Sequence, residues 1–234
     1  MAQALNAREQ NLLGMIVRDY VATAEPVGSE YLRKKYHLPM SPATIRKSMM
    51  ALEDAGFLAQ PHTSAGRVPT EEGYRHYVQY CSSPKKVDAT AQEFAPRFQS
   101  WVEEDVAEIK QVARELSEHL KEGVFLGIGR HESYYTGLSH LLSQPEFASH
   151  DIVAQIGKML DVLDEVVARL TLEVSSGVTV LIGRENPFDE SCATIIAPRT
   201  TSNGERFIIG IIGPMRMDYD IIIPLMEHFS KKLL

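Results

Sequence analysis

The chain has 234 residues, of which 44% are hydrophobic and 24% charged, and its net charge is −7. This length allows one or two domains, and the near-average composition excludes collagen, wholly disordered chains and disulfide scaffolds. No run of about 18 apolar residues is present, so we expect no membrane-spanning helix, and no signal peptide is visible. The two cysteines, Cys81 and Cys192, lie far apart, which fits a reducing cytoplasm and gives no metal-ligand pair.

The negative charge is unevenly distributed along the chain. The first 80 residues carry nine Lys and Arg against eight Asp and Glu, whereas the remainder carries fifteen against twenty-three. Within residues 27–50, five cations accompany a single acid, Glu30. A local basic patch in an acidic chain is typical of a DNA-binding domain joined to an acidic partner domain. On charge alone, a solvated helix face explains the patch equally well.

Four helices are expected in the first domain, which we place at residues 1–80, and the last of them runs from an N-cap at Thr70 to about Tyr80. The first spans about 7–22 behind an N-cap at Asn6, with an acid three residues later, as in a capping box. The second spans about 29–36. The third spans about 42–55 and starts with a serine N-cap followed by proline, a strong helix-start signal.

The third helix has the pattern of a DNA-recognition helix. Ile45, Met49 and Leu52 form its apolar stripe, and the opposite face carries small residues and cations. A short helix joined by a tight turn to a helix with a basic outer face predicts a helix-turn-helix. Because a guanidinium pairs with guanine through two bonds, we assign Arg46 to base readout. The DNA-binding residues expected on these helices are Arg33, Lys34, Ser41, Ala43, Thr44, Arg46, Lys47 and Met50.

A short hairpin follows the third helix. Residues 57–60 and 67–69 read as strands around a loop, and a ribbon in this place is typical of a wing. We expect the wing to contact the DNA backbone or minor groove through His62, Thr63, Ser64 and Arg67. The alternative is an ordinary surface hairpin.

A linker at residues 81–95 precedes a long helix at 96–122. Apolar residues along this helix recur at alternating spacings of four and three, as in a heptad seam. The seam predicts a dimerisation surface made of Val102, Val106, Ile109, Leu116 and Leu120. A helix packed on its own domain explains the pattern equally well, since three heptads are the minimum for a coiled coil.

Residues 123–234 alternate between helical and strand patterns, which predicts an α+β domain with an antiparallel sheet. The expected strands span 124–129, 178–182, 191–197 and 206–212, and the expected helices span 135–142, 150–173 and 219–233.

The motifs of enzymes are missing from the sequence. There is no H-E-x-x-H, G-x-S-x-G or P-loop pattern, and the histidines of the second half are scattered. We therefore expect a protein without catalytic activity, metal or cofactor.

Several segments carry a resemblance to a known family. EPVGS, SPATIR, LEDAGFL and PHTSAGRVPTEEGYR resemble the winged-helix domain of the bacterial heat-inducible transcription repressor (HrcA) family. YYTGLSHLLSQPEF, VTVLIGREN and IGIIGPMRMDY are similar to its GAF-like domain. The resemblance implies a cytoplasmic homodimer that represses chaperone genes at an inverted-repeat operator, with the GroEL chaperonin as a partner.

Two departures from the family pattern stand out. Family members carry an inserted dimerisation domain before the GLSHLLSQPEF-like segment, and this chain has a much shorter stretch there. Lys47-Ser48 stands where the family pattern usually has Asn-Glu. These departures favour a short variant, and they leave open an HrcA-like paralogue that acts in protein interaction or ligand sensing, with a different operator.

Overall fold

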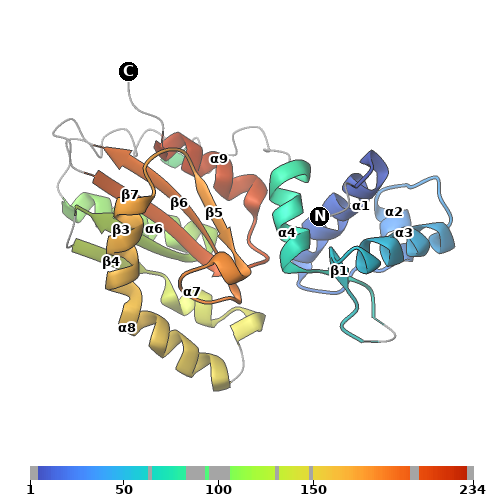
Figure 1. Ribbon diagram of the computed structural model, residues 1–234, viewed down its shortest axis with the longest axis horizontal. Coiled ribbons are helices and arrows are strands. Elements are labelled where there is room, and N and C mark those ends of the chain that lie inside the picture. The colour runs from blue at the N-terminus through green and yellow to red at the C-terminus, as the bar shows by residue number, and fades with distance from the viewer. Residues whose placement is uncertain are drawn as a thin grey trace. The chain divides into compact units, whose positions relative to one another are not determined.

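The protein is described by a computed structural model in which two compact units are present (Figure 1). Residues 1–83 with 216–219 form the N-terminal unit, and residues 84–215 with 220–234 form the C-terminal unit. The structure describes residues 5–62, 65–82, 93–94, 106–129, 132–147, 150–200 and 206–230.

The N-terminal unit contains helices and one two-stranded antiparallel ribbon. Its elements are α1 (Ala7–Thr23), α2 (Ser29–Lys35), α3 (Pro42–Asp54), β1 (Leu58–Ala59), β2 (Val68–Pro69), α4 (Glu71–His76) and the π-helical turn η1 (Tyr77–Cys81). The register of the ribbon places Leu58 opposite Pro69. These bounds confirm the four expected helices, the last of which continues into η1, and the hairpin behind the third.

Side-chain caps fix where the helices of this unit begin. Asn6 Oδ1 accepts the N–H groups of Arg8 and Glu9, and the Glu9 carboxylate accepts the Asn6 N–H, which completes the expected capping box. Ser41 Oγ accepts the Thr44 N–H at 3.2 Å at the start of α3. After α3, Gly56 adopts a φ of +84°, the left-handed conformation that ends a helix.

The C-terminal unit is a five-stranded antiparallel sheet with helices. Its elements are α6 (Val106–Leu120), β3 (Gly123–Ile128), β4 (Glu132–Thr136), α7 (Leu138–Leu142), η2 (Pro145–Phe147), α8 (His150–Glu173), β5 (Thr179–Ile182), η3 (Gly183–Glu185), β6 (Cys192–Thr200), β7 (Arg206–Pro214) and α9 (Tyr219–Ser230). The strand order is β4-β3-β7-β6-β5, and every pair is antiparallel. This confirms the α+β class with an antiparallel sheet.

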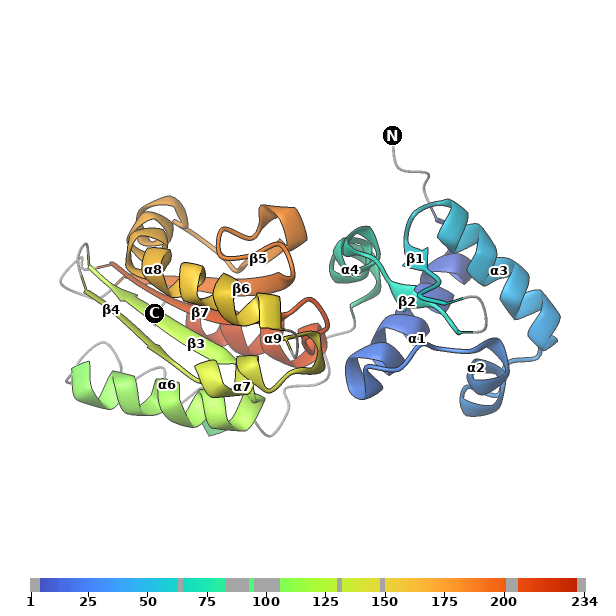
Figure 2. The same ribbon diagram turned by 90° about the horizontal axis from the view of Figure 1, so that it is seen from below.

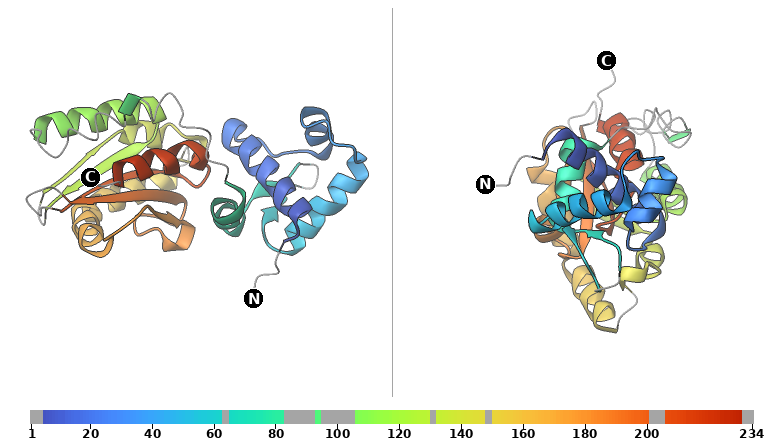
Figure 3. Two further views of the ribbon diagram at one scale, coloured as in Figure 1. Left: turned by 90° about the horizontal axis from the view of Figure 1, so that it is seen from above. Right: turned by 90° about the vertical axis from the view of Figure 1, so that its right-hand side faces the viewer.

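Helices cover both faces of the sheet, so β3 is buried along its whole length. Figure 2 shows α8 on one face and α6 on the other. On the α8 side, Phe125 of β3 packs edge-on against Phe188 at a centroid distance of 5.3 Å. α9 also lies against the sheet (Figure 3), where its Phe229 ring is 5.7 Å from the guanidinium of Arg199.

One expected helix is wrong at its start. The sequence predicts a helix over 135–142, but Tyr135 and Thr136 belong to β4, where Tyr135 pairs with Phe125 of β3. Gly137, with a φ of +78°, separates this strand from α7. The pairing of this segment with β3 overrides its local helical pattern. A short window of sequence does not show which strand a segment will pair with. The first part of the expected 96–122 helix lies outside the described residues.

Candidate nucleic-acid interface

α3 presents two chemically different faces. Ile45, Met49 and Leu52 are buried in the N-terminal unit, with exposed fractions of at most 3%. The opposite face is exposed and contains the predicted residues Ser41, Ala43, Thr44, Arg46, Lys47 and Met50. The predicted phase of the helix is therefore confirmed, while contact of this face with DNA stays a prediction.

The cations of the basic patch differ in whether an acid neutralises them. Glu30 lies 3.2 Å from Arg33 Nη2 and 3.5 Å from Lys34 Nζ. The hydrogen bond from Arg33 is the main reason that the pKa of Glu30 is lowered. Because one carboxylate serves both cations, Arg33 and Lys34 offer less free positive charge than their sequence suggests.

Arg46 and Lys47 behave differently from the cations of α2. Among the residues that the structure describes, neither side chain has an ion pair or a hydrogen bond. Both are exposed on the outer face of α3. Two adjacent cations without acidic partners provide the uncompensated charge that a polyanion requires.

The ribbon after α3 is held closed near its base. Gln60 Nε2 donates to the Ala65 carbonyl oxygen at 3.1 Å across the loop. His62 is exposed, as the prediction for the wing requires. Thr63 and Ser64, the other two predicted tip residues, lie outside the described residues.

Arg67 is bound within the unit, and its contact with DNA stays a prediction. Its Nε and Nη2 atoms each lie 2.8 Å from Glu53 Oε2 near the end of α3. The Arg67 side chain is only 13% exposed. Because its largely buried guanidinium is bonded to a carboxylate, Arg67 connects the ribbon to α3.

A backbone contact that the sequence did not indicate adds to this connection. Arg67 and Val27 exchange two hydrogen bonds of 2.9 Å as an isolated antiparallel bridge. At Gly66, a Cβ would lie 2.3 Å from the Val27 carbonyl oxygen, so only glycine allows this approach. In the sequence, the glycine at position 66 could indicate a close backbone approach, but it does not show that Val27 is the partner.

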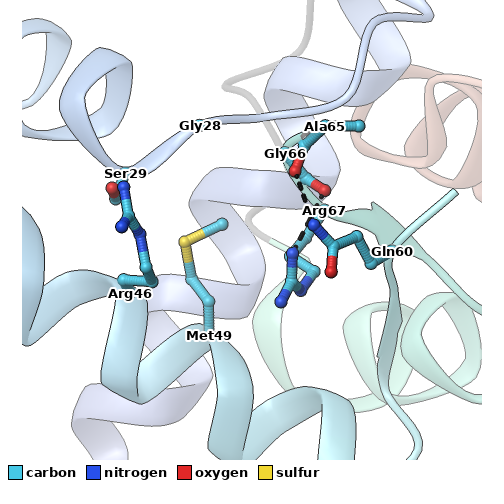
Figure 4. Close-up of a pocket in the computed structure, with 8 residues that line it drawn as sticks. All are labelled: Gly28, Ser29, Arg46, Met49, Gln60, Ala65, Gly66 and Arg67. Carbon is cyan, nitrogen blue, oxygen red and sulfur yellow. Dashed lines mark hydrogen bonds between the residues drawn. The ribbon is translucent and has the colours of Figure 1, made fainter. Parts of the chain in front are cut away.

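The start of α2, α3 and the β1–β2 ribbon together line a pocket of about 370 Å³ in the N-terminal unit. It is lined by Gly28, Ser29, Arg46, Met49, Gln60, Ala65, Gly66 and Arg67. In Figure 4 the Arg46 side chain extends from α3 towards Ser29, and Arg67 lies across the pocket beside Gln60. Two arginines, an amide and backbone groups therefore converge on one recess, and no acid is among the described residues that line it.

The predicted dimer seam on α6 needs a correction. Ile109 and Leu116 are 2% and 0% exposed within the C-terminal unit itself. Val112 and Ala113 are also buried there, because α6 lies against β3 and β4. A side chain already covered by its own sheet cannot form the core of a coiled coil. Val106 and Leu120 are partly buried, and Val102 lies outside the described residues.

The described residues offer no group of three or more His, Cys, Asp or Glu side chains that could hold a metal ion. Burial raises the pKa of the Cys192 thiol to about 12, so this thiol is protonated and unreactive at neutral pH. None of the described helices is long and apolar enough to cross a membrane.

Comparisons with known proteins agree with the family resemblance. The family described as "HrcA protein C terminal domain" matches residues 83–223. A heat-inducible transcription repressor HrcA from Symbiobacterium thermophilum is 28% identical, and the alignment covers 98% of this chain and 98% of that relative. That alignment extends over 333 residues, so this relative is considerably longer than the present chain. The HrcA of Chlorobium chlorochromatii is 54% identical over 84 residues, which is 36% of this chain and 24% of that relative.

A solved structure supports the fold. The crystal structure of a hypothetical protein matches with a TM-score of 0.72 at 22% identity, over 97% of this chain and 99% of that chain. The family match covers more than half of the present chain, and the relatives carry the names of transcription repressors, not of enzymes. The chain therefore belongs to the HrcA family.

Proposed function

We propose that this chain is a transcription repressor whose N-terminal unit is a winged helix-turn-helix that binds operator DNA. In this proposal α3 enters the major groove and the β1–β2 ribbon is the wing. The observation that carries the proposal is the outer face of α3, where Arg46 and Lys47 are exposed and have no acidic partner among the described residues. Ala43, Thr44 and Met50 on the same face supply groups that can touch thymine methyls and base edges.

The C-terminal unit has the antiparallel sheet expected of the GAF-like domain, and we propose that it supports dimerisation. A homodimer presents two α3 helices to an inverted repeat, with half-sites about one helical turn or a multiple apart. Since Ile109 and Leu116 are covered by their own sheet, the dimer uses another surface. By the family resemblance, the regulated genes encode chaperones, the signal is heat, and the GroEL chaperonin is a partner.

The test is selection of bound fragments from random DNA by the full chain, followed by gel shifts on the selected sequence. We expect an inverted repeat and a dimeric complex by light scattering. Lys47→Ala is expected to weaken binding at least tenfold, because it removes an uncompensated cation from the recognition face. A protein that selects no sequence would contradict the proposal and favour a paralogue that acts through protein interaction or ligand sensing.

A further inference from the structure

The pocket between α2, α3 and the wing has properties that the proposed function leaves unused. Its described walls come from three separate parts of the sequence: residues 28–29, residues 46 and 49, and residue 60 with residues 65–67. Its volume of about 370 Å³ accommodates a phosphate group together with bound water. The recess therefore has the size and the donor groups of an anion subsite.

The two arginines of the pocket differ in availability. Glu53 neutralises Arg67 through two contacts of 2.8 Å, and this carboxylate is not among the lining residues. Arg46 has no such partner among the described residues, and its side chain extends along the wall towards Ser29 (Figure 4). The uncompensated charge in the pocket thus belongs to Arg46.

We propose that this pocket holds one phosphate of the DNA backbone, with the Arg46 guanidinium as its ligand; this inference rests on the proposed DNA-binding function. A guanidinium presents a planar fork of N–H donors that matches two phosphate oxygens. Its position in a recess flanked by α2 and the wing suits a backbone contact, which fixes the register of a protein on DNA. This assignment replaces the base-reading role that the sequence suggested for Arg46 and leaves base readout to Ala43, Thr44, Lys47 and Met50.

Gly28 gives a test that adds charge to the pocket without disturbing the fold. Its φ is −98°, which any residue adopts, and a Cβ built there meets no atom within 4 Å. It is the N-cap of α2 and makes no side-chain cap bond, so both Asp and Asn improve the cap. Gly28→Asp and Gly28→Asn have nearly the same shape, and the ratio of their DNA affinities isolates the effect of one negative charge.

We expect the Gly28→Asp protein to bind duplex DNA about tenfold more weakly than the Gly28→Asn protein at about 0.1 M salt, on operator and unrelated DNA alike. The same pair of substitutions at Ala22, which is exposed on α1 and does not line the pocket, measures the effect of one added charge elsewhere on the unit. A Gly28 ratio near one, or equal to the Ala22 ratio, would overturn the proposal. If the wild-type chain binds no duplex at all, the proposed function itself fails, which is a different result.

Arg46→Ala separates a phosphate contact from base readout. We expect it to weaken binding by a similar factor on every duplex, and to reduce the slope of log affinity against log salt by about one. Relaxed preference at a single base position with an unchanged salt slope would show that Arg46 reads a base, and the proposal would be wrong.

A further arm distinguishes the DNA backbone from a free phosphorylated ligand. We expect inorganic phosphate, compared with chloride at equal ionic strength, to leave the Tm of the wild-type protein unchanged. A phosphate-specific rise in Tm that Gly28→Asp abolishes would assign the pocket to a free ligand and overturn its assignment to DNA.

Discussion

The two units of this protein obtain their structure in different ways. In the N-terminal unit, side chains close in sequence set the helix ends, as Asn6 and Ser41 do, and the proposed function lies on one exposed helix face. In the C-terminal unit, β3 and nearly all of β6 are buried, and the sheet is joined through the pairing of β3 with β7, which is distant in the chain. Substitutions in the first unit should therefore separate fold from function, whereas substitutions in the second should act mainly on the fold.

The largest expected effect tests that separation on α3. Ile45→Ala should lower the free energy of unfolding by about 2–5 kcal/mol, because the side chain is fully buried. Lys47→Ala should change stability by less than about 0.5 kcal/mol, because its side chain is exposed and makes no contact with an acid among the described residues. Hydrogen exchange of peptides from residues 7–82 measures both changes. If Lys47→Ala unfolded this unit, the two faces of α3 would not be independent.

Two glycine substitutions in the C-terminal unit test whether tight packing of the sheet sets its stability. A Cβ at Gly210 in β7 would lie 2.0 Å from the Phe125 ring, which is buried and edge-on to Phe188. Gly210→Ala should therefore cost about 1–3 kcal/mol through overpacking. Gly157→Ala in α8, where a Cβ meets nothing within 4 Å, should instead stabilise the protein by about 0.5–1 kcal/mol. Urea titrations of both variants measure the difference, and equal effects would contradict the packing of this sheet.

The smallest effect concerns the ion pair that joins the β1–β2 ribbon to α3. Glu53→Ala should cost about 1 kcal/mol of stability, since it leaves the largely buried Arg67 guanidinium without its carboxylate acceptor. Loss of an acid should raise affinity for DNA by charge alone, but displacement of the wing should lower it. We expect lower affinity by fluorescence anisotropy.

Asp54→Ala is the matched control for that experiment. Asp54 is the next residue on α3, is exposed, and makes no hydrogen bond or ion pair with the β1–β2 ribbon among the residues that the structure describes. Its removal should raise DNA affinity slightly. If Glu53→Ala and Asp54→Ala raised affinity alike, the ion pair would have no positioning role.

Sequence reasoning succeeded where local chemistry decides the structure. The limits of α1 and α3 and the buried stripe of Ile45, Met49 and Leu52 were predicted, as were an antiparallel sheet and all of its described strands except β4. It failed where the answer depended on a distant segment. The heptad pattern of α6 showed an apolar face but not that its own sheet covers Ile109 and Leu116.

The β1–β2 ribbon shows the same limit at the candidate site. Arg67 follows a loop and looks available to a nucleic acid in the sequence. In the structure, its side chain pairs with Glu53 and its backbone bonds to Val27. No short window of sequence contains these three residues together. The pocket beside it was likewise missed, because its walls come from three separate segments.

The close approach of Gly66 to Val27 has a consequence for protein engineering. Residues 66–67 are fixed by their contact with Val27, and Gln60 bonds to Ala65 across the loop. Contacts at both ends therefore hold the loop between these points. Exchange of residues 61–64 for the corresponding loop of another repressor should therefore leave the scaffold intact. The hairpin offers an exchangeable cassette, and chimaeras that keep Gly66 and Arg67 can be screened for new operator preferences without redesign of the helices.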